Sequence, residues 1–414
     1  MMSLTGLPAY KAYKDSKIEW LGRVPEHWKL TRLKFLSSIK TGEKDTVHRL
    51  DDGQYPFFIR SPKVQRIDTY SFDGEAVLTA GDGDIGKIFH YINGRFDYHQ
   101  RVYKFSDFDE ITGRYLYYYL HHNLAEEVIK LSAKTTVDSL RLPYLQNFFV
   151  AVPPPIEQIA IANFLDHKTA QIDQAITSKE QQIRLLKERK QILIQQAVTQ
   201  GLNLDAPKRD SGVEWIGKIP EHWEERRFKY MFTQSRLPVR RDDGVVTSYR
   251  DGEVTLRSNR RTSGYTEAIL EGGYQGIRKG QLVLNSMDAF EGAIGVSDSD
   301  GKCTPEYVVC DPVSDDFVPE YFAYLLREMA LAKYIQVICN AVRQRAVRIR
   351  YNNLASRFLV VPPREEQLKI VEYIKSNSKQ IDEAVLHYQK QIDSLKEYKT
   401  TLINSVVTGK IKVA

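Results

Sequence analysis

Two stretches of the chain carry apolar residues at the seven-residue spacing of a helix that packs along a narrow seam. In both stretches a lysine occupies the same step of the pattern. The first frame contains Ile176, Lys179, Ile183, Leu186, Lys190, Leu193 and Ala197, and the second contains Val385, Tyr388, Ile392, Leu395, Lys399, Leu402 and Val406. The pattern predicts two long helices, and Gly201 and Gly409 stand just beyond them, where glycine commonly ends a helix.

The narrow seam favours pairing of the two helices with each other, while the alternative is that each packs on its own domain. The residues expected to pair are Ile176, Ile183, Leu186 and Leu193 with Val385, Ile392, Leu395 and Leu402. An antiparallel pair would hold the flanking modules apart. About 22 helical residues at ~1.5 Å each give roughly 33 Å, close to the ~34 Å of one turn of B-DNA.

The same plan occurs twice along the chain. A tryptophan motif reads DSKIEWLGRVPEHW at residues 15–28 and DSGVEWIGKIPEHW at 210–223. A proline motif reads VPPPIEQ at 152–158 and VPPREEQ at 361–367, directly before each predicted helix. The stretches between the motifs diverge. This arrangement indicates two modules with one task and different targets, and a gene duplication without division of function is the alternative.

The divergent stretches combine short strand patterns, such as residues 76–78 and 282–284, with helical patterns at 111–131 and 317–337. An α+β fold follows, with two globular domains joined by the two long antiparallel helices in an internal pseudo-two-fold repeat. The predicted division is 1–155 (first globular domain with its N-terminal segment), 156–205 (central helical region), 206–363 (second globular domain) and 364–414 (C-terminal helical region).

Composition narrows the class of protein. The 414 residues have a formal net charge of +6, which permits nucleic-acid binding without requiring it. No apolar run approaches the ~20 residues of a membrane helix, and the polar N-terminus lacks the apolar core of a secretory signal. Three cysteines cannot build a disulfide framework, so we expect a cytoplasmic protein.

Candidate DNA contacts are cationic and amide side chains in polar segments, because these bind phosphates and base edges. In the first module they are Lys40, Lys44, Arg60, Lys63, Arg66, Lys87, Gln100, Arg101, Lys134, Thr135 and Thr136, together with Asp82, which can accept a cytosine amino group. In the second module they are Arg257, Arg260, Arg261, Arg343, Gln344, Arg345 and Arg348. Any single one of them is also explained as a solvated surface charge.

Catalytic and metal motifs are missing from the sequence. Residues 81–86 have the glycine spacing of a dinucleotide fingerprint, but the pattern after them predicts a strand, where the fingerprint needs a helix. A turn between strands is therefore expected there, and again at 287–295. Cys303 and Cys310 lack zinc spacing, and His27 and His222 lie within the repeated tryptophan motif, where a structural role is expected. We expect a non-catalytic chain with no metal or cofactor of its own.

The paired tryptophan and proline motifs, each occurring twice and in order, resemble the specificity subunits of type I restriction–modification systems. The resemblance runs from about Asp15 to Ile411. It implies two target-recognition domains, at about 25–155 and 220–363, that each recognise one half of a split asymmetric DNA site. It also implies that the helices at about 156–200 and 365–409 form an antiparallel coiled coil that sets the unread spacer.

The same resemblance implies partners and contact loops. Two methyltransferase subunits would bind, two ATP-driven restriction subunits can join, and these partners would supply S-adenosylmethionine, ATP and Mg²⁺ chemistry. The turn at 79–87 and the segment at 134–136 would face DNA. The alternatives are a duplicated protein-binding scaffold without DNA specificity, an orphan specificity protein without active partners, and an enzyme acting alone, for which catalytic motifs are missing.

Overall fold

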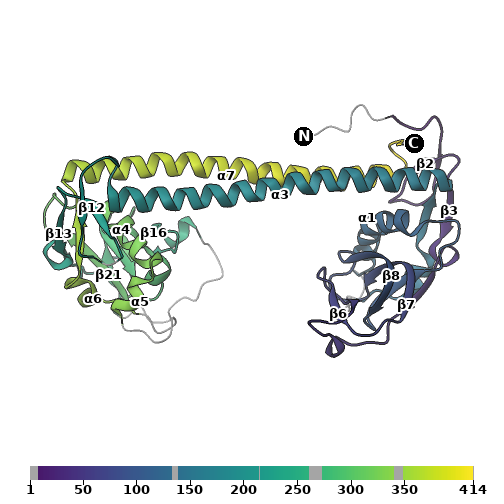
Figure 1. Ribbon diagram of the computed structural model, residues 1–414, viewed down its shortest axis with the longest axis horizontal. Coiled ribbons are helices and arrows are strands. Elements are labelled where there is room, and N and C mark those ends of the chain that lie inside the picture. Colours follow the sequence, from purple (N-terminus) through teal and green to yellow (C-terminus); the bar gives the residue numbers. More distant parts are fainter. Residues whose placement is uncertain (1–7, 133–138, 214, 261–272, 340–347, 414) are drawn as a thin grey trace. The chain divides into compact units, whose positions relative to one another are not determined.

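The computed structural model describes residues 8–132, 139–213, 215–260, 273–339 and 348–413. The chain divides into two compact units, each with one globular module and one stretch of both long helices (Figure 1). Unit 1 joins the two ends of the chain, Met1–Gln181 and Tyr388–Ala414, whereas unit 2 is the continuous segment Gln182–His387.

The module of unit 1 is built on a six-stranded sheet of order β4-β9-β7-β8-β5-β6, in which only the β5–β8 pair is parallel. Its strands are β4 (Ser38–Thr41), β5 (Tyr55–Phe58), β6 (Gln65–Ile67), β7 (Phe72–Ala80), β8 (Phe89–Tyr98) and β9 (Val102–Ser106). Two-stranded ladders join β1 (Tyr13–Asp15) to β2 (Arg23–Pro25) and β3 (Lys29–Arg32) to β10 (Phe149–Val152). Helix α1 (Gly113–Ser132) packs against β7 and β8, and α2 (Leu142–Asn147) precedes β10.

The module of unit 2 has a four-stranded sheet of order β14-β21-β18-β19, all antiparallel. These strands are β14 (Phe232–Gln234), β18 (Leu282–Asn285), β19 (Ile294–Val296) and β21 (Tyr307–Pro312). The two-stranded ladders are β11 (Lys208–Asp210) with β12 (Lys218–Pro220), β13 (Glu224–Arg227) with β22 (Phe358–Val361), β15 (Val246–Ser248) with β16 (Val254–Leu256), and β17 (Gln275–Ile277) with β20 (Gly301–Cys303). The helices are α4 (Pro319–Leu331), α5 (Tyr334–Ile338) and α6 (Tyr351–Ala355).

The two modules follow one plan, and the prediction of an α+β fold is confirmed. The ladder β3–β10 corresponds to β13–β22, and the strands β4, β9, β7 and β8 correspond to β14, β21, β18 and β19. Unit 2 has no parallel ladder like β5–β8 among its described strands, but two isolated parallel bridges, Val245–Lys302 and Val254–Ser297. The helical pattern at 317–337 is two helices instead of one, because Lys333 adopts a left-handed backbone (φ 61°) between α4 and α5.

Strand β8 follows the glycine-rich turn after β7, so the sequence at 81–86 is a strand–strand connection as predicted. The prolines of the proline motifs also act as expected. They end β10 and β22 and lead directly into α3 (Pro155–Gln200) and α7 (Arg364–Val407). The four-part domain division stays a prediction, since the two compact units cut across both long helices.

The seam pattern of the long helices is visible in their burial. Along α3 the residues of the predicted frame are buried or half-buried while most of their neighbours are exposed, and Ile392, Leu395 and Leu402 of α7 are buried. The helices end where glycine takes the left-handed conformation, at Gly201 (φ 74°) and Gly409 (φ 73°). These glycines also lack space for a side chain, because a Cβ on Gly409 would lie 2.3 Å from Pro25.

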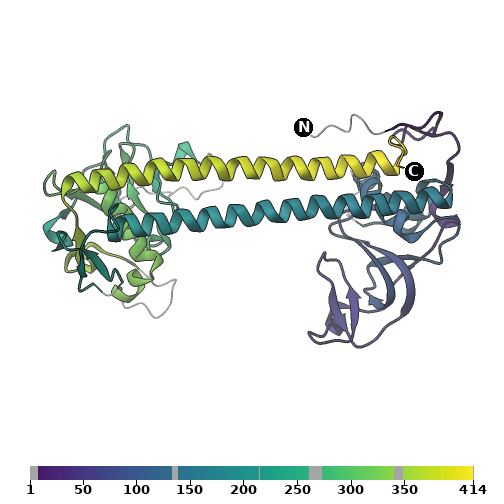
Figure 2. The ribbon, with the colours of Figure 1, turned by 45° about the horizontal axis from the view of Figure 1, so that its top comes forward.

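The helices α3 and α7 lie side by side (Figures 1 and 2) and are joined by matching ion pairs in each unit. In unit 1, Lys399 of α7 donates to both carboxylate oxygens of Asp173 at 2.7 Å. In unit 2, Lys190 of α3 donates to Asp382 at 2.8 and 2.7 Å. Lys179 also bonds to Gln391, so residue numbers that rise along α3 fall along α7 and the contacts in unit 1 are antiparallel.

The repeated motifs meet at the start of each long helix. In unit 1, His27 lies 2.7 Å from Glu157, and the indole of the fully buried Trp28 donates to the same carboxylate at 3.0 Å. In unit 2, His222 lies 2.8 Å from Glu366. The repeated histidines therefore join the tryptophan motif to the proline motif, which is the structural role expected from the sequence.

A fully buried glutamine ends each proline motif and holds the module helix. Gln158 accepts a hydrogen bond from the Thr112 amide (2.7 Å) and donates to the carbonyls of Glu110 (2.8 Å) and Pro153 (2.9 Å). Gln367 makes the same three bonds in unit 2, with the Val318 amide and the carbonyls of residues 316 and 362. Each glutamine thus ties the beginning of α1 or α4 to the beginning of a long helix.

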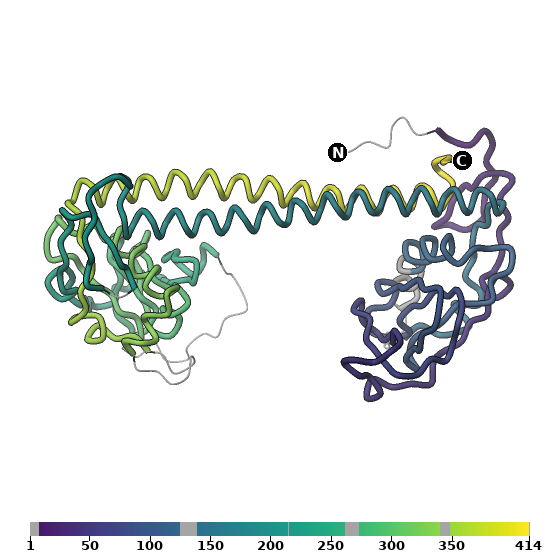
Figure 3. The backbone as a smooth tube through the Cα atoms, viewed as in Figure 1, coloured from purple at the N-terminus to yellow at the C-terminus, as the bar shows by residue number. Residues whose placement is uncertain are grey.

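A buried tyrosine on each module helix contacts the last turn of the other long helix. Tyr115 of α1 donates to the carbonyl of Val407 in α7 (3.1 Å), and Tyr321 of α4 donates to the carbonyl of Val198 in α3 (2.9 Å). The C-terminal segment also reaches the N-terminal one, because the Lys412 amide donates to the Pro8 carbonyl at 2.7 Å (Figure 3). Unit 1 is therefore closed by residues from both ends of the chain.

Candidate nucleic-acid interface

Three of the predicted DNA-contact residues meet at the turn after β7. The carboxylate of Asp82 accepts one hydrogen bond from Arg60, which follows β5 (2.7 Å), and another from Arg101, between β8 and β9 (2.8 Å). Desolvation acts to raise the pKa of Asp82, but the two guanidinium groups outweigh it and the pKa is lowered. The arginine side chains stay 40% and 59% exposed, so the pairs fix their orientation while leaving them accessible.

A second group of predicted residues adjoins this cluster through the chain. The amide of Gln100 donates to the Lys44 carbonyl at 2.8 Å, and its side chain donates to Asp45 at 2.7 Å. Hydrogen bonds, first from the Thr46 amide and then from Gln100, lower the pKa of Asp45. Because Gln100 precedes Arg101, these residues form one polar edge with the Asp82 cluster.

Other predicted residues of the first module lie elsewhere on the sheet. Lys40 is on β4 and Arg66 is on β6, which are the two opposite edge strands. The guanidinium of Arg66 donates to the carbonyls of Gly53 (2.8 Å) and Gln54 (3.1 Å), so it braces a turn. The exposed Lys63 lies in the segment before β6, and Lys87 pairs with Asp84 at 2.9 Å within the turn after β7.

Seven predicted residues lie outside the described part of the chain: Lys134, Thr135, Thr136, Arg261, Arg343, Gln344 and Arg345. The residues that follow two of these segments are placed, and both lie at the turn of their module. The Leu140 amide donates to the Gly81 carbonyl (2.7 Å), and Ser139 forms a bridge with Asp82. In unit 2 the Ile349 amide donates to the Ser286 carbonyl (3.2 Å).

Unit 2 repeats the arginine–aspartate pair with residues that the sequence analysis did not select. Arg250 follows β15 as Arg60 follows β5, and its guanidinium lies 3.0 Å from Asp288 in the turn after β18. Arg250 also pairs with Glu291. The signal was present in the sequence, because aligning GEAVL at 74–78 with GQLVL at 280–284 places Asp82 over Asp288.

Two of the predicted arginines of the second module, Arg260 and Arg257, differ in the groups that they contact. Arg260 bonds to both Asp251 and Glu253 at 2.8 Å and lies 4.1 Å from the ring centre of Tyr249, so its charge is already compensated. Arg257, in a short 3-10 helix, contacts Thr247 at 3.4 Å.

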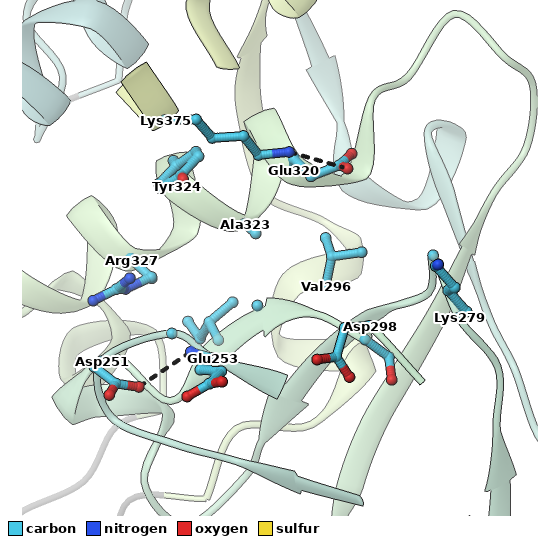
Figure 4. A pocket seen from close by; sticks show the side chains of 15 residues that line it. Asp251, Glu253, Lys279, Val296, Asp298, Glu320, Ala323, Tyr324, Arg327 and Lys375 are labelled. Atoms are coloured by element: carbon cyan, nitrogen blue, oxygen red, sulfur yellow. Dashed lines mark hydrogen bonds and ion pairs between the residues drawn. The ribbon is translucent and has the colours of Figure 1, made fainter. Parts of the chain in front are cut away.

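Arg348 lines a cavity of about 300 Å³ beside the turn after β18. Arg236 and Arg350 line it too, with Gln234 and Glu306. Three guanidinium groups around one hollow make this the strongest candidate in unit 2 for contact with phosphates or base edges. A second cavity, of about 490 Å³ beside α4, is lined by more carboxylates than cations and suits an anion less well (Figure 4).

Other kinds of site receive little support. In the described ranges, no group of three or more histidine, cysteine, aspartate or glutamate residues could hold a metal ion. Cys303 and Cys310 are buried thiols whose pKa is raised by desolvation, to about 12 for Cys303, which makes it a poor nucleophile. Over the same ranges, none of the helices has the length and apolar character to cross a membrane.

Sequence comparisons give these sites a context. Residues 25–185 match the family model described as the type I restriction modification DNA specificity domain. The chain is 25% identical to the type I restriction enzyme EcoDI specificity subunit of Escherichia coli, over 86% of this chain and 82% of that protein. It is 23% identical to a putative type I restriction enzyme MjaX specificity subunit of Methanocaldococcus jannaschii, over 98% of this chain and 99% of that protein.

Comparison with solved structures supports the fold. A chain of a type I R-M system, from a study of complex assembly and conformational transition, aligns with a TM-score of 0.61 at 13% identity, covering 93% of this chain and 98% of that one. The HsdS subunit from Thermoanaerobacter tengcongensis aligns with a TM-score of 0.53, also at 13% identity, covering 94% and 98%. Both share the mixture of helices and sheets described above.

Proposed function

We propose that this chain is the DNA-recognition subunit of a restriction–modification complex, because residues 25–185 match the type I restriction modification DNA specificity domain and the chain is similar along most of its length to type I specificity subunits. The observation that carries the proposal is the family match over 25–185, the segment that contains the Arg60–Asp82–Arg101 cluster. Two modules of one plan support a split target, with each module recognising one half of an asymmetric site.

The arginine–aspartate pairs supply a chemical basis for recognition. An arginine held by a carboxylate has its planar fork oriented before DNA arrives, so less conformational entropy is lost when it bonds to guanine or phosphate. Arg60 and Arg101 would act in this way for one half-site, and Arg250 with the arginines of the cavity at Arg348 for the other. The pairs differ in their surroundings, as two modules with different targets require.

The long helices would set the distance between the half-sites. The ion pairs Asp173–Lys399 and Lys190–Asp382, together with the buried seam residues, support an antiparallel coiled coil. Such a coil is stiff compared with a flexible linker, so the number of unread base pairs would be fixed.

We further propose that the chain is non-catalytic and acts in the cytoplasm through partner subunits. Methyltransferase subunits would bring S-adenosylmethionine, and restriction subunits would bring ATP and Mg²⁺. The exposed residues of the long helices would offer surface for these contacts.

Methylation mapping tests the function directly. The chain would be co-expressed with the methyltransferase encoded beside it, and modified adenines in the host DNA would be located by sequencing. A motif of two short specified parts separated by a fixed gap supports the proposal. A continuous motif would refute two-module recognition, and an unmodified genome despite a stable complex with the methyltransferase would favour a protein-binding scaffold.

A further inference from the structure

Each module helix is attached to a long helix by contacts that are the same in both units. The glutamines Gln158 and Gln367 make equivalent bonds, and so do the tyrosines Tyr115 and Tyr321. These shared contacts would accept either module on either helix. A feature that matches a module to its own helix must therefore lie where the two units differ.

One such difference is an ion pair between the second residue of the module helix and the long helix. In unit 1, Arg114 of α1 bonds to both oxygens of Asp166 in α3, with Nε at 2.9 and 3.2 Å. The hydroxyl of Tyr118 donates to the same carboxylate at 2.6 Å. The guanidinium also lies 4.7 and 5.1 Å from the ring centres of Tyr91 and Tyr117, so it is held from several sides.

In unit 2 the same two positions carry the opposite charges. The second residue of α4 is Glu320, and Lys375 of α7 stands at the place of Asp166, 209 residues further on. Their charged groups lie 3.7 Å apart (Figure 4). Two of the tyrosines around Arg114, Tyr91 and Tyr117, are replaced by Gly295 and Ala323, which line the cavity of about 490 Å³ beside this pair, whereas Tyr118 corresponds to Tyr324.

We propose that the reversed polarity of this pair makes each recognition module specific for its own long helix. If the modules were interchanged, Arg114 would face Lys375 and Glu320 would face Asp166. Both junctions would then place like charges together, and the bidentate bond between the half-buried Arg114 and Asp166 would be lost. The ion pairs between α3 and α7 do not discriminate in this way. In each unit an aspartate in the first half of one long helix, Asp173 or Asp382, pairs with a lysine in the second half of the other, Lys399 or Lys190.

Matching of a module to its helix affects assembly of the chain and is independent of DNA recognition, so its absence would leave the proposed function standing. The first experiment keeps the modules in their native order. Arg114→Glu should lower the thermal midpoint of unit 1 by roughly 4–8 °C, since about 2 kcal/mol corresponds to that shift in a unit of this size. Adding Asp166→Lys should restore at least half of the loss. Lys29→Glu, which breaks an exposed pair with Glu110, is the matched control and should change the midpoint little.

The second experiment interchanges the modules, residues 29–152 and 224–361, in the full chain. The interchanged chain should have a higher thermal midpoint on helices recoded with Asp166→Lys and Lys375→Asp than on wild-type helices. The native order should show the reverse preference. Equal midpoints on both sets of helices would overturn the proposal. Should neither interchanged chain fold, the native-order cycle decides, and independent effects of Arg114→Glu and Asp166→Lys there would overturn it.

Discussion

Replacing Gln158 with leucine should lower the free energy of unfolding of unit 1 more than a glutamine-to-leucine change at an exposed position. The side chain is fully buried and makes three hydrogen bonds to backbone groups, with the Thr112 amide and the carbonyls of Glu110 and Pro153. Leucine has a similar volume, so the packing changes little and the lost bonds dominate. With about 1 kcal/mol per bond, and more where a buried group is left without a partner, the cost is roughly 3–6 kcal/mol.

Hydrogen exchange measured by mass spectrometry can locate this effect. The Gln158→Leu chain should exchange faster at the beginning of α1, because the Thr112 amide loses its acceptor. The beginning of α4 should be unchanged, since Gln367 performs that role in unit 2. Gln174→Leu, at an exposed position of α3, is the control for adding an apolar side chain. A loss of unfolding free energy below about 1 kcal/mol, or equal acceleration in both modules, would refute the reasoning.

Three further predictions concern charge, the helix seam and DNA. Burial of Glu328 raises its pKa to about 7, above the value of the unfolded chain. The free energy of unfolding should therefore fall as the pH rises from about 4.5 to 7, by roughly 3 kcal/mol in total. Glu328→Gln should abolish this contribution when the free energy of unfolding is measured from pH 4 to 8. Leu186→Ala with Leu395→Ala should weaken binding to a split site more than binding by an isolated module, and equal losses in a gel-shift titration would contradict coupling through the helices. Arg101→Ala should relax one half of the methylated motif about tenfold or more, and a change in both halves would argue against separate recognition.

Sequence patterns predicted the helices well because their periodicity is long and repeated. The seam frame, the terminal glycines and the proline breaks all correspond to observed features of α3 and α7. The break at Lys333 was not predicted, because a left-handed lysine leaves no signal in an apolar pattern that continues across it.

The candidate site was predictable only in part. Arg60, Asp82 and Arg101 were selected one by one, but their convergence depends on strand pairing, which brings residues from three connections to one edge. Arg250 was not predicted because it has no arginine beside it in the sequence, whereas the predicted DNA contacts of the second module came from segments with several arginines. The burial that makes Gln158 and Gln367 important is likewise invisible in the proline motif, which shows only that a glutamine recurs.

The order of synthesis has a consequence for how this chain folds. Unit 2 is continuous and can close as soon as His387 has left the ribosome, whereas unit 1 needs residues 388–414 to complete it. Until then the hydroxyl of Tyr115 cannot donate its hydrogen bond to the Val407 carbonyl, and Pro25 is not yet packed against Gly409. The half made first is therefore finished last, and its exposed apolar surface must avoid aggregation throughout translation. A premature stop after unit 2 would leave a complete second module joined to an unclosed first one.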